Sequence, residues 1–207
     1  MVAPDEAMPG RDHYPYPLAS SNVVLHTRLK GPWSATTEVL YVAMGCFWGA
    51  EKKFWRIPGV VSTAVGYQGG FTPYPTYDET CTARTGHTEA VMIAYEPSNV
   101  STYDLLKVFW ENHDPTTLYQ QGNDVGTQYR SAIYWTTESQ RDLIERTRDA
   151  YNEVLLAKGF DPITTEIAAA ANLPFYLAED YHQQYLFKNP HGYDCHANTG
   201  IELPALG

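Results

Sequence analysis

Cys46 has the clearest capacity for chemistry in this chain, because of what flanks it. It lies in the segment 45–49 (GCFWG), after an apolar, β-branched run over 38–44 that predicts a buried strand and before a run over 50–57 that predicts a helix. This spacing puts Cys46 at or near a helix N-terminus, where unpaired backbone N–H groups and the helix dipole favour the nucleophilic thiolate. The alternative is a buried cysteine that only packs, as most free cysteines do.

A second thiol, Cys195, lies near the other end of the chain, in a stretch rich in Gly, Asn and His that predicts mobile coil. A rigid thiol at a helix end and a thiol on a flexible tail are suited to act as attacking and resolving cysteines. An exposed surface thiol is the alternative. With Cys81 the chain has three cysteines, too few for a structural disulfide framework at this size, and the absence of any CxxC pair argues against a thioredoxin-type dithiol or a zinc ribbon.

Glu89 is the candidate acid, because it lies in a run over 87–95 (HTEAVMIAY) that predicts a strand apolar on both faces. A carboxyl group in such a strand loses hydration, which raises its pKa and keeps it protonated. A general acid needs this state near neutral pH. Alternatively, Glu89 lies at the exposed start of the strand or forms a salt bridge with Arg84 or Arg130.

Two loops supply further polar candidates. Tyr77 follows the Gly- and Pro-rich segment 69–75, and Tyr129 ends a polar loop that also contains Asp124. Both phenols could point O–H groups into a shared site, and Asp124 could orient a water or a neighbouring side chain. Since the chain has 16 tyrosines, most of them must pack or lie on the surface, and Asp124 could simply form a turn.

Phe47 and Trp48, directly after Cys46, could wall an apolar pocket beside the thiol or belong to the ordinary core.

The histidines raise two other hypotheses. His113 and Asp114, if placed against Cys46, would suggest a Cys-His-Asp hydrolase. His182, His191, Cys195 and His196 could be drawn as a metal site, although they show no recurrent ligand spacing. We expect neither arrangement, and we predict no metal and no cofactor.

Length and composition set the broad class. With 207 residues, 43% of them hydrophobic, the chain can close one sizeable core. No run approaches the roughly 20 apolar residues of a spanning helix. The first residues lack the basic and then apolar pattern of a signal peptide, so a reducing cytoplasmic location is expected. A formal net charge of −10 argues against a nucleic-acid partner.

The order of predicted elements indicates the fold. Residues 1–37, with five prolines and no periodicity, predict an arm that packs on a single catalytic domain over 38–207, whose tail over 188–207 is mobile coil. Strands are predicted over 38–44, 60–67, 87–95, 131–135 and 163–167, and helices over 50–57, 101–113, 137–159 and 178–186, with a long loop over 68–86. This order predicts an α+β two-layer sandwich with a mainly antiparallel sheet and a ferredoxin-like split βαβ core.

Several motifs in register resemble the peptide methionine sulfoxide reductase A family over essentially the whole chain. They are MPGR at 8–11, GCFWG at 45–49, GGFTP at 69–73, PTY at 75–77, TGHTEAV at 85–91, FWENHDP at 109–115, QGND at 121–124, GTQYRS at 126–131 and AEDYHQQY at 178–185.

The resemblance implies a mechanism. Cys46 would attack the sulfoxide sulfur of the S epimer of methionine sulfoxide, Glu89 would supply a proton to the oxygen, and Tyr77 and Tyr129 would donate hydrogen bonds to it. Methionine would leave, and Cys46 would remain as a sulfenic acid.

The resemblance also implies the rest of the site and the cycle. Phe47 and Trp48 would hold the methyl group of the substrate, and Asp124 would order the polar side of the pocket. Cys195 would form a disulfide with Cys46, which thioredoxin would reduce. The implied substrates are oxidised proteins or free methionine sulfoxide, and the implied role is protein repair under oxidative stress, with no nucleic-acid or membrane partner.

One departure from the family matters. Many relatives have the resolving cysteine directly after Gly-Tyr and another cysteine nearer the C-terminus, whereas Asp194 here separates Tyr193 from Cys195 and no cysteine follows. We therefore expect a single Cys46–Cys195 disulfide rather than a three-cysteine relay. Cys81 is expected to pack.

Overall fold

The computed structural model describes residues 1–194 and 197–206. Within these residues the main sheet has six strands in the order β10-β4-β5-β3-β8-β9, and two short hairpins, β1-β2 and β6-β7, lie outside it. The strands are β1 (Ser21–Asn22), β2 (Thr27–Arg28), β3 (Glu38–Met44), β4 (Val60–Gln68), β5 (Thr88–Tyr95), β6 (Gln120–Gln121), β7 (Asp124–Val125), β8 (Ser131–Trp135), β9 (Glu166–Ala169) and β10 (Tyr176–Leu177). The helices are α1 (Phe47–Phe54), α2 (Tyr77–Cys81), α3 (Thr102–Glu111), α4 (Glu138–Ala157) and α5 (Tyr185–Lys188), with 3-10 turns η1 (Thr127–Tyr129) and η2 (Ala170–Asn172).

The centre of the sheet is antiparallel. Strand β5 lies between β4 and β3, antiparallel to both, and β3 pairs antiparallel with β8. Helix α1 therefore joins two strands, β3 and β4, that run in the same direction with β5 between them, and α3 joins β5 to β8 across β3. The edge strand β9 pairs parallel to β8. The prediction of a mixed fold with a mainly antiparallel sheet is confirmed.

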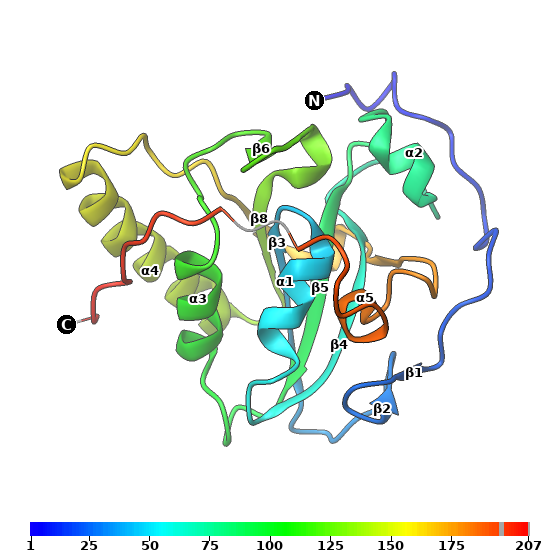
Figure 1. Cartoon of the computed structure of the whole chain (residues 1–207), viewed down its shortest axis with the longest axis horizontal. Helices are drawn as coiled ribbons and strands as arrows, with labels where there is room; N and C mark the ends of the chain where they lie inside the picture. Colours follow the sequence, from blue (N-terminus) through cyan, green and yellow to red (C-terminus); the bar gives the residue numbers. More distant parts are fainter. Residues whose placement is uncertain (195–196, 207) are drawn as a thin grey trace.

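Helices α1, α3 and α4 cover one face of the sheet (Figure 1). The main core lies between these two layers, because alternate strand residues such as Val42, Val91 and Ile133 face apolar residues of the helices, among them Phe54 and Leu105. Side chains of this size contribute about 1.5–3 kcal/mol each when fully buried. Since strand side chains alternate, Glu89 shares the helix-covered face with Val91.

The helix ends follow local sequence signals. In α3, which lies within the helix predicted over 101–113, Ser101 and Asp104 form a capping box. In α4, the Thr137 hydroxyl accepts a hydrogen bond from the Gln140 backbone amide. The Gln140 side chain accepts one from the Thr136 backbone amide, so no capping box forms with Thr137. Gly159, at φ +85°, follows the end of α4 and allows the chain to leave it.

Three predicted elements are wrong in extent. The loop over 68–86 contains α2, whose start is a capping box between Thr76 and Glu79. The strand predicted over 163–167 begins later, as β9. The helix predicted over 178–186 is reduced to α5, which begins at Tyr185, because Gln184 adopts a left-handed conformation at φ +47°.

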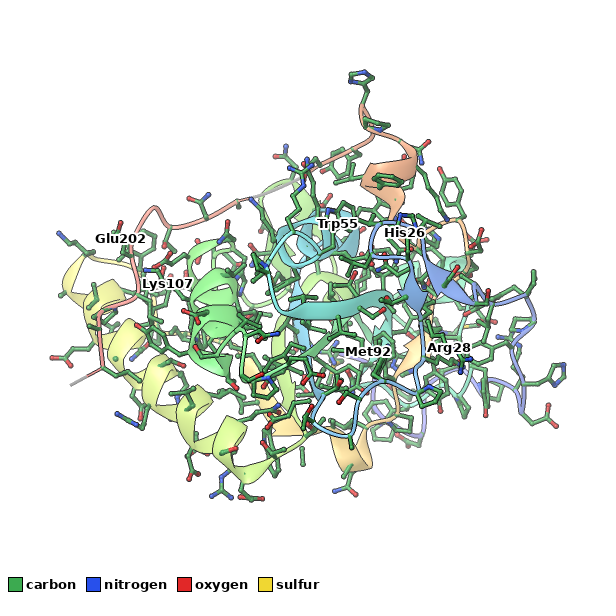
Figure 2. The ribbon with its side chains drawn as sticks, turned by 90° about the horizontal axis from the view of Figure 1, so that it is seen from below. His26, Arg28, Trp55, Met92, Lys107 and Glu202 are labelled. Atoms are coloured by element: carbon green, nitrogen blue, oxygen red, sulfur yellow. The ribbon has the colours of Figure 1, made fainter. Side chains whose placement is uncertain are left out.

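Both ends of the described chain pack on the domain. In the N-terminal arm (residues 1–37), the side-chain Nδ2 of Asn22 donates a hydrogen bond of 3.0 Å to the Thr63 carbonyl oxygen. In the C-terminal segment, Leu203 is buried and its amide donates to the Glu111 carboxylate at 2.7 Å. Figure 2 shows this segment passing α3, with Glu202 beside Lys107. Among the described residues, no helix is both long and apolar enough to cross a membrane.

Candidate active site

Cys46 lies in the turn between β3 and α1, as the sequence predicts. It is the N-cap of α1, with φ −53° and ψ 119°, and is 8% exposed. The preceding residue must be glycine, because Gly45 has φ +89° and a Cβ atom there would lie 2.7 Å from Cβ of Gln121. The turn thus presents a buried sulfur at the start of a helix.

The acidity of Cys46 differs from the sequence-based expectation. Burial raises the pKa of this thiol, and Glu89, once it is ionised at high pH, raises it further, while the backbone N–H groups of Trp48 and Gly49 lower it. Burial outweighs the helix end, since removing a thiolate from water costs more than two amide hydrogen bonds return. The prediction of a favoured thiolate is therefore wrong for this structure, in which Cys46 is a neutral thiol.

Glu89 is a buried, neutral acid. Its side chain is 1% exposed on β5, opposite Tyr67 of β4, and its Oε2 accepts a hydrogen bond of 2.9 Å from the Phe47 amide nitrogen. Burial raises the pKa of Glu89 to about 8, and the charge of Asp124 adds to the shift. Because Oε2 accepts a proton donor, the acid proton belongs on Oε1.

The salt bridge considered as an alternative role for Glu89 does not form with Arg130. The Arg130 Nε atom lies 2.9 Å from Oε2 of Glu166 instead.

The two predicted phenols come from separate elements. Tyr77 is the first residue of α2, and Tyr129 is the last residue of η1. Burial raises the pKa of both phenols, and Glu89, which is ionised at the high pH where phenols titrate, contributes to each shift, so both phenols lie within electrostatic range of this carboxyl group. Both phenols therefore hold their protons at neutral pH and can donate hydrogen bonds.

An aromatic wall, formed by Phe47, Trp48, Tyr77, His182 and Tyr185, lies beside Cys46. The Phe47 and Tyr77 rings stack with centroids 6.3 Å apart, and the Trp48 ring stacks on Tyr185 at 3.9 Å. His182 lies between these pairs, 4.4 Å from the Tyr77 ring, and its Nδ1 accepts a hydrogen bond of 3.1 Å from Trp48 Nε1. The wall offers an apolar surface next to the sulfur.

Sequence reasoning missed this role of His182, which it considered only as a metal ligand. The signal was the aromatic spacing of the motif over 181–185, but only the fold brings that segment against α1.

Asp124 lies on the polar side of the site. Its charge raises the pKa of Cys46 and of Glu89, and its Oδ1 accepts a hydrogen bond of 2.9 Å from the Tyr193 hydroxyl. Asp194, which follows Tyr193 in the chain, forms an ion pair of 2.8 Å with Lys52 of α1. Cys195, the predicted resolving thiol, lies outside the described residues.

The alternative chemistries find little support. The His113 ring nitrogens lie 2.7 Å from the Phe109 carbonyl oxygen and from the Ser131 hydroxyl, so this histidine is engaged in the core as a structural residue. Among residues 1–194 and 197–206, no group of three or more His, Cys, Asp or Glu side chains could hold a metal ion. The metal hypothesis also invoked Cys195 and His196, which lie outside the described residues.

Cys81 is exposed at the end of α2, so its predicted packing role is wrong.

The mixed α/β fold and this arrangement define a thiol enzyme in which the cysteine is accompanied by a neutral carboxylic acid rather than by a histidine. The model of the family described as peptide methionine sulfoxide reductase matches residues 38–205. The chain belongs to this family, whose members are oxidoreductases that act on methionine sulfoxide.

Individual relatives agree over nearly the full length. The chain is 55% identical over 199 residues to a peptide methionine sulfoxide reductase MsrA of Rhodospirillum centenum, covering 96% of this chain and 90% of the relative. It is 52% identical over 204 residues to one of Brucella anthropi, covering 99% and 92%. Methionine sulfoxide reductase A of Corynebacterium diphtheriae has a similar structure, with a TM-score of 0.85, 45% identity and 99% of both chains covered.

Proposed function

We propose that this protein reduces the S epimer of methionine sulfoxide, protein-bound or free, to methionine, as part of protein repair under oxidative stress. The observation that carries the proposal is the buried neutral Glu89, bound to the amide directly after Cys46. A proton donor that is neutral near pH 7 is what a sulfoxide oxygen needs to become a leaving group.

The first step transfers one oxygen atom. Cys46 attacks the sulfoxide sulfur while Glu89 protonates the oxygen, and the thiol proton returns to Glu89. The attack forms a transient S–S bond between Cys46 and the substrate; this bond and the substrate S–O bond then break as the oxygen passes to Cys46, a new S–O bond forms on Cys46, and two electrons pass to the substrate sulfur. The products are methionine and the Cys46 sulfenic acid, with no net proton consumed. Because Cys46 rests as a thiol, its proton must leave as the oxygen is protonated.

The remaining residues bind and orient the substrate. Tyr77 and Tyr129 donate hydrogen bonds to the sulfoxide oxygen, where negative charge develops. Phe47 and Trp48 contact the methyl group through the aromatic wall, and Asp124 orders the polar side of the site. These roles accord with the positions of the side chains around Cys46 and Glu89.

The cycle closes through a second thiol. Cys195 attacks the sulfenic acid, which forms the Cys46–Cys195 disulfide and releases water, and thioredoxin then reduces the disulfide. The contacts of Tyr193 and Asp194 with Asp124 and Lys52 support this role, because they hold the residues next to Cys195 at the site. A reducing compartment such as the cytoplasm suits the cycle, and neither a metal nor a cofactor takes part in it.

We also infer the domain organisation. Residues 38–207 form the catalytic domain, which includes the C-terminal tail over 188–207, and residues 1–37 form an arm that packs on it. The order β4-β5-β3-β8, with α1 and α3 as crossovers, supports a ferredoxin-like split βαβ core.

The test is turnover of separated epimers of methionine sulfoxide with dithiothreitol or thioredoxin as reductant. We expect methionine from the S epimer and none from the R epimer, and no turnover by Cys46→Ser. An active Cys46→Ser protein would overturn the assignment. Ester or amide hydrolysis without sulfoxide reduction would instead favour the Cys-His hydrolase, and thiol or metal binding without turnover would favour a non-enzymatic protein.

A further inference from the structure

We propose that Arg11, in the N-terminal arm, is a positioning residue for Tyr77, so that the arm sets the place of one of the two phenols around the substrate oxygen. This inference rests on the proposed reduction of methionine sulfoxide. It assigns a function to a segment that lies before the part of the chain matched by the family model, which begins at residue 38.

Tyr77 lies on an element that cannot hold its own shape. Helix α2 has five residues, and isolated helices shorter than about 12–15 residues are marginal in water. Its start depends on Glu79, whose Oε2 accepts a hydrogen bond of 2.9 Å from the Thr76 amide, while the Thr76 hydroxyl accepts one from the Glu79 amide. The position of Tyr77 therefore depends on where the Glu79 carboxylate is held.

Arg11 holds that carboxylate. Its guanidinium binds Glu79 in a two-pronged ion pair, with Nη1 2.8 Å from Oε2 and Nη2 2.5 Å from Oε1, and Nη1 also donates to the Tyr74 carbonyl oxygen at 2.8 Å. Both side chains are partly buried, at 29% and 19% exposure, and bidentate pairs of this kind fix geometry as well as charge. The pair lowers the pKa of Glu79 to about 2, so the carboxylate is charged throughout the working range.

The arm contacts the same loop at further points, so Arg11 does not act as an isolated surface charge. The Arg11 amide donates to the Pro73 carbonyl oxygen at 3.1 Å, the Thr72 hydroxyl donates to the Met8 carbonyl oxygen at 2.8 Å, and the Tyr16 hydroxyl donates to the Pro75 carbonyl oxygen at 3.0 Å. Figure 1 shows the arm beginning beside α2 and following that edge of the molecule to β1.

A second anchor holds Tyr77 from the other side, because its amide donates to the Glu179 carboxylate at 2.9 Å. Glu179 alone fixes the backbone of one residue, whereas the direction of α2, and with it the phenol, needs the second point that Arg11 supplies through Glu79. Loss of this pair should therefore displace the phenol without unfolding the domain.

The test is a set of double mutants, measured as methionine released per second from the S epimer in single turnovers. Arg11→Met should lower the rate about fivefold, and by no more than Tyr77→Phe does, with a smaller change in KM. Glu79→Gln keeps a residue suited to the capping box but removes the charge, so it should reproduce Arg11→Met, and the two together should be no worse than either one. Arg11→Lys should recover part of the loss.

Epistasis with the phenols separates positioning from general damage. In a Tyr77→Phe background Arg11→Met should have no further effect, whereas in a Tyr129→Phe background its effect should persist. Arg148→Met, which removes an exposed ion pair with Asp149 on α4, is the matched control and should match the original protein. The proposal is overturned if Arg11→Met is fully active, or if its effect is as large in the Tyr77→Phe background.

Failure of the inference is distinct from failure of the proposed function. If the unaltered chain does not reduce methionine sulfoxide, the proposed function fails. If it does, and the Arg11 variants behave like Arg148→Met, only the inference fails. Far-ultraviolet circular dichroism and the melting temperature show whether Arg11→Met is folded. If it is not, Glu79→Gln carries the same comparison in both phenol backgrounds.

Discussion

The Glu89 carboxyl group accepts a hydrogen bond of 2.9 Å from the Phe47 amide nitrogen, the first free N–H group of α1. This contact joins the middle of the sheet to the helix that begins at Cys46. It uses an amide that the helix itself leaves unpaired, and it orients a neutral acid toward the thiol. The positions of acid and nucleophile are therefore coupled through one backbone group.

Replacement of Glu89 by Gln should leave this contact in place, because an amide oxygen can still accept from Phe47, while the acidic proton is lost. We expect the rate of methionine release to fall about 10²- to 10⁴-fold with little change in substrate binding. Single-turnover kinetics with the S epimer measure this rate of methionine release. An unchanged rate would assign the acid role to another group.

The pH dependence of the chemical step should follow Glu89. Its pKa is raised to about 8, so the acid is protonated below that pH and the rate should decline as the pH rises through about 8. Glu89→Gln should lack this decline. A rate profile measured between pH 6 and 10 under single-turnover conditions checks it, and a decline that persists in Glu89→Gln would implicate another group.

The free energy of unfolding should also depend on the protonation of Glu89, and it should decrease as the pH rises. Between the ordinary pKa of a glutamate, about 4.3, and about 8, the folded protein binds a proton at Glu89 that the unfolded chain has lost, so the free energy of unfolding decreases as the pH rises through this window. Glu89→Gln should flatten this part of the curve in urea unfolding measured at several pH values. The same slope in both proteins would contradict the shifted pKa.

The two phenols should be partly redundant. Tyr77→Phe or Tyr129→Phe removes one donor to the sulfoxide oxygen, and each should lower the rate on the order of tenfold. The double variant should lose more than the product of the two single losses, since the remaining phenol compensates in each single variant. Strictly multiplicative losses would argue that the phenols act on different atoms.

Cys195→Ser should separate the two halves of the cycle. We expect one methionine released per chain and then arrest with thioredoxin, because the sulfenic acid has no second thiol with which to condense. Dithiothreitol, which can attack the sulfenic acid itself, should restore turnover. Sustained turnover of Cys195→Ser with thioredoxin would show that another group resolves the intermediate.

Glu51 should be a stability residue of α1. Its carboxyl group is fully buried, with a pKa raised to about 7 by burial, and accepts hydrogen bonds from the Thr63 hydroxyl and from both the amide and the side chain of Gln184. Glu51→Ala would remove the acceptor of the Thr63 hydroxyl and of the Gln184 backbone amide, at a cost of about 2–4 kcal/mol in the free energy of unfolding. Urea unfolding measures this cost, and Glu153→Ala, at an exposed position of α4, is the control. Equal losses of unfolding free energy in the two variants would contradict a stabilising role of Glu51.

The strands, helices and caps encoded by near neighbours in sequence could be predicted well. The apolar runs that became β3, β5 and β8, and the caps at Ser101 and Thr137, depend on residues a few positions apart. Helix α2 was missed although Thr76 and Glu79 form a local capping box, because its five residues lie within a Gly- and Pro-rich loop and carry no apolar periodicity. The helix expected over 178–186 was misplaced because Gln184 adopts a left-handed conformation, so that a helix begins only at Tyr185.

By itself, the sequence determined the candidate residues of the site and the place of Cys46 at a helix start, because residue type and spacing carry that information directly. Only the tertiary structure decided the surroundings of those residues. It places His182 between Trp48 and Tyr77, and it brings the Tyr193 hydroxyl to Asp124 as a hydrogen-bond donor. It also decides the neutral state of Cys46. The physical reason is that burial and charge are sums over neighbours from the whole chain. A local motif predicts the nucleophile, but its acidity depends on how much water the fold removes.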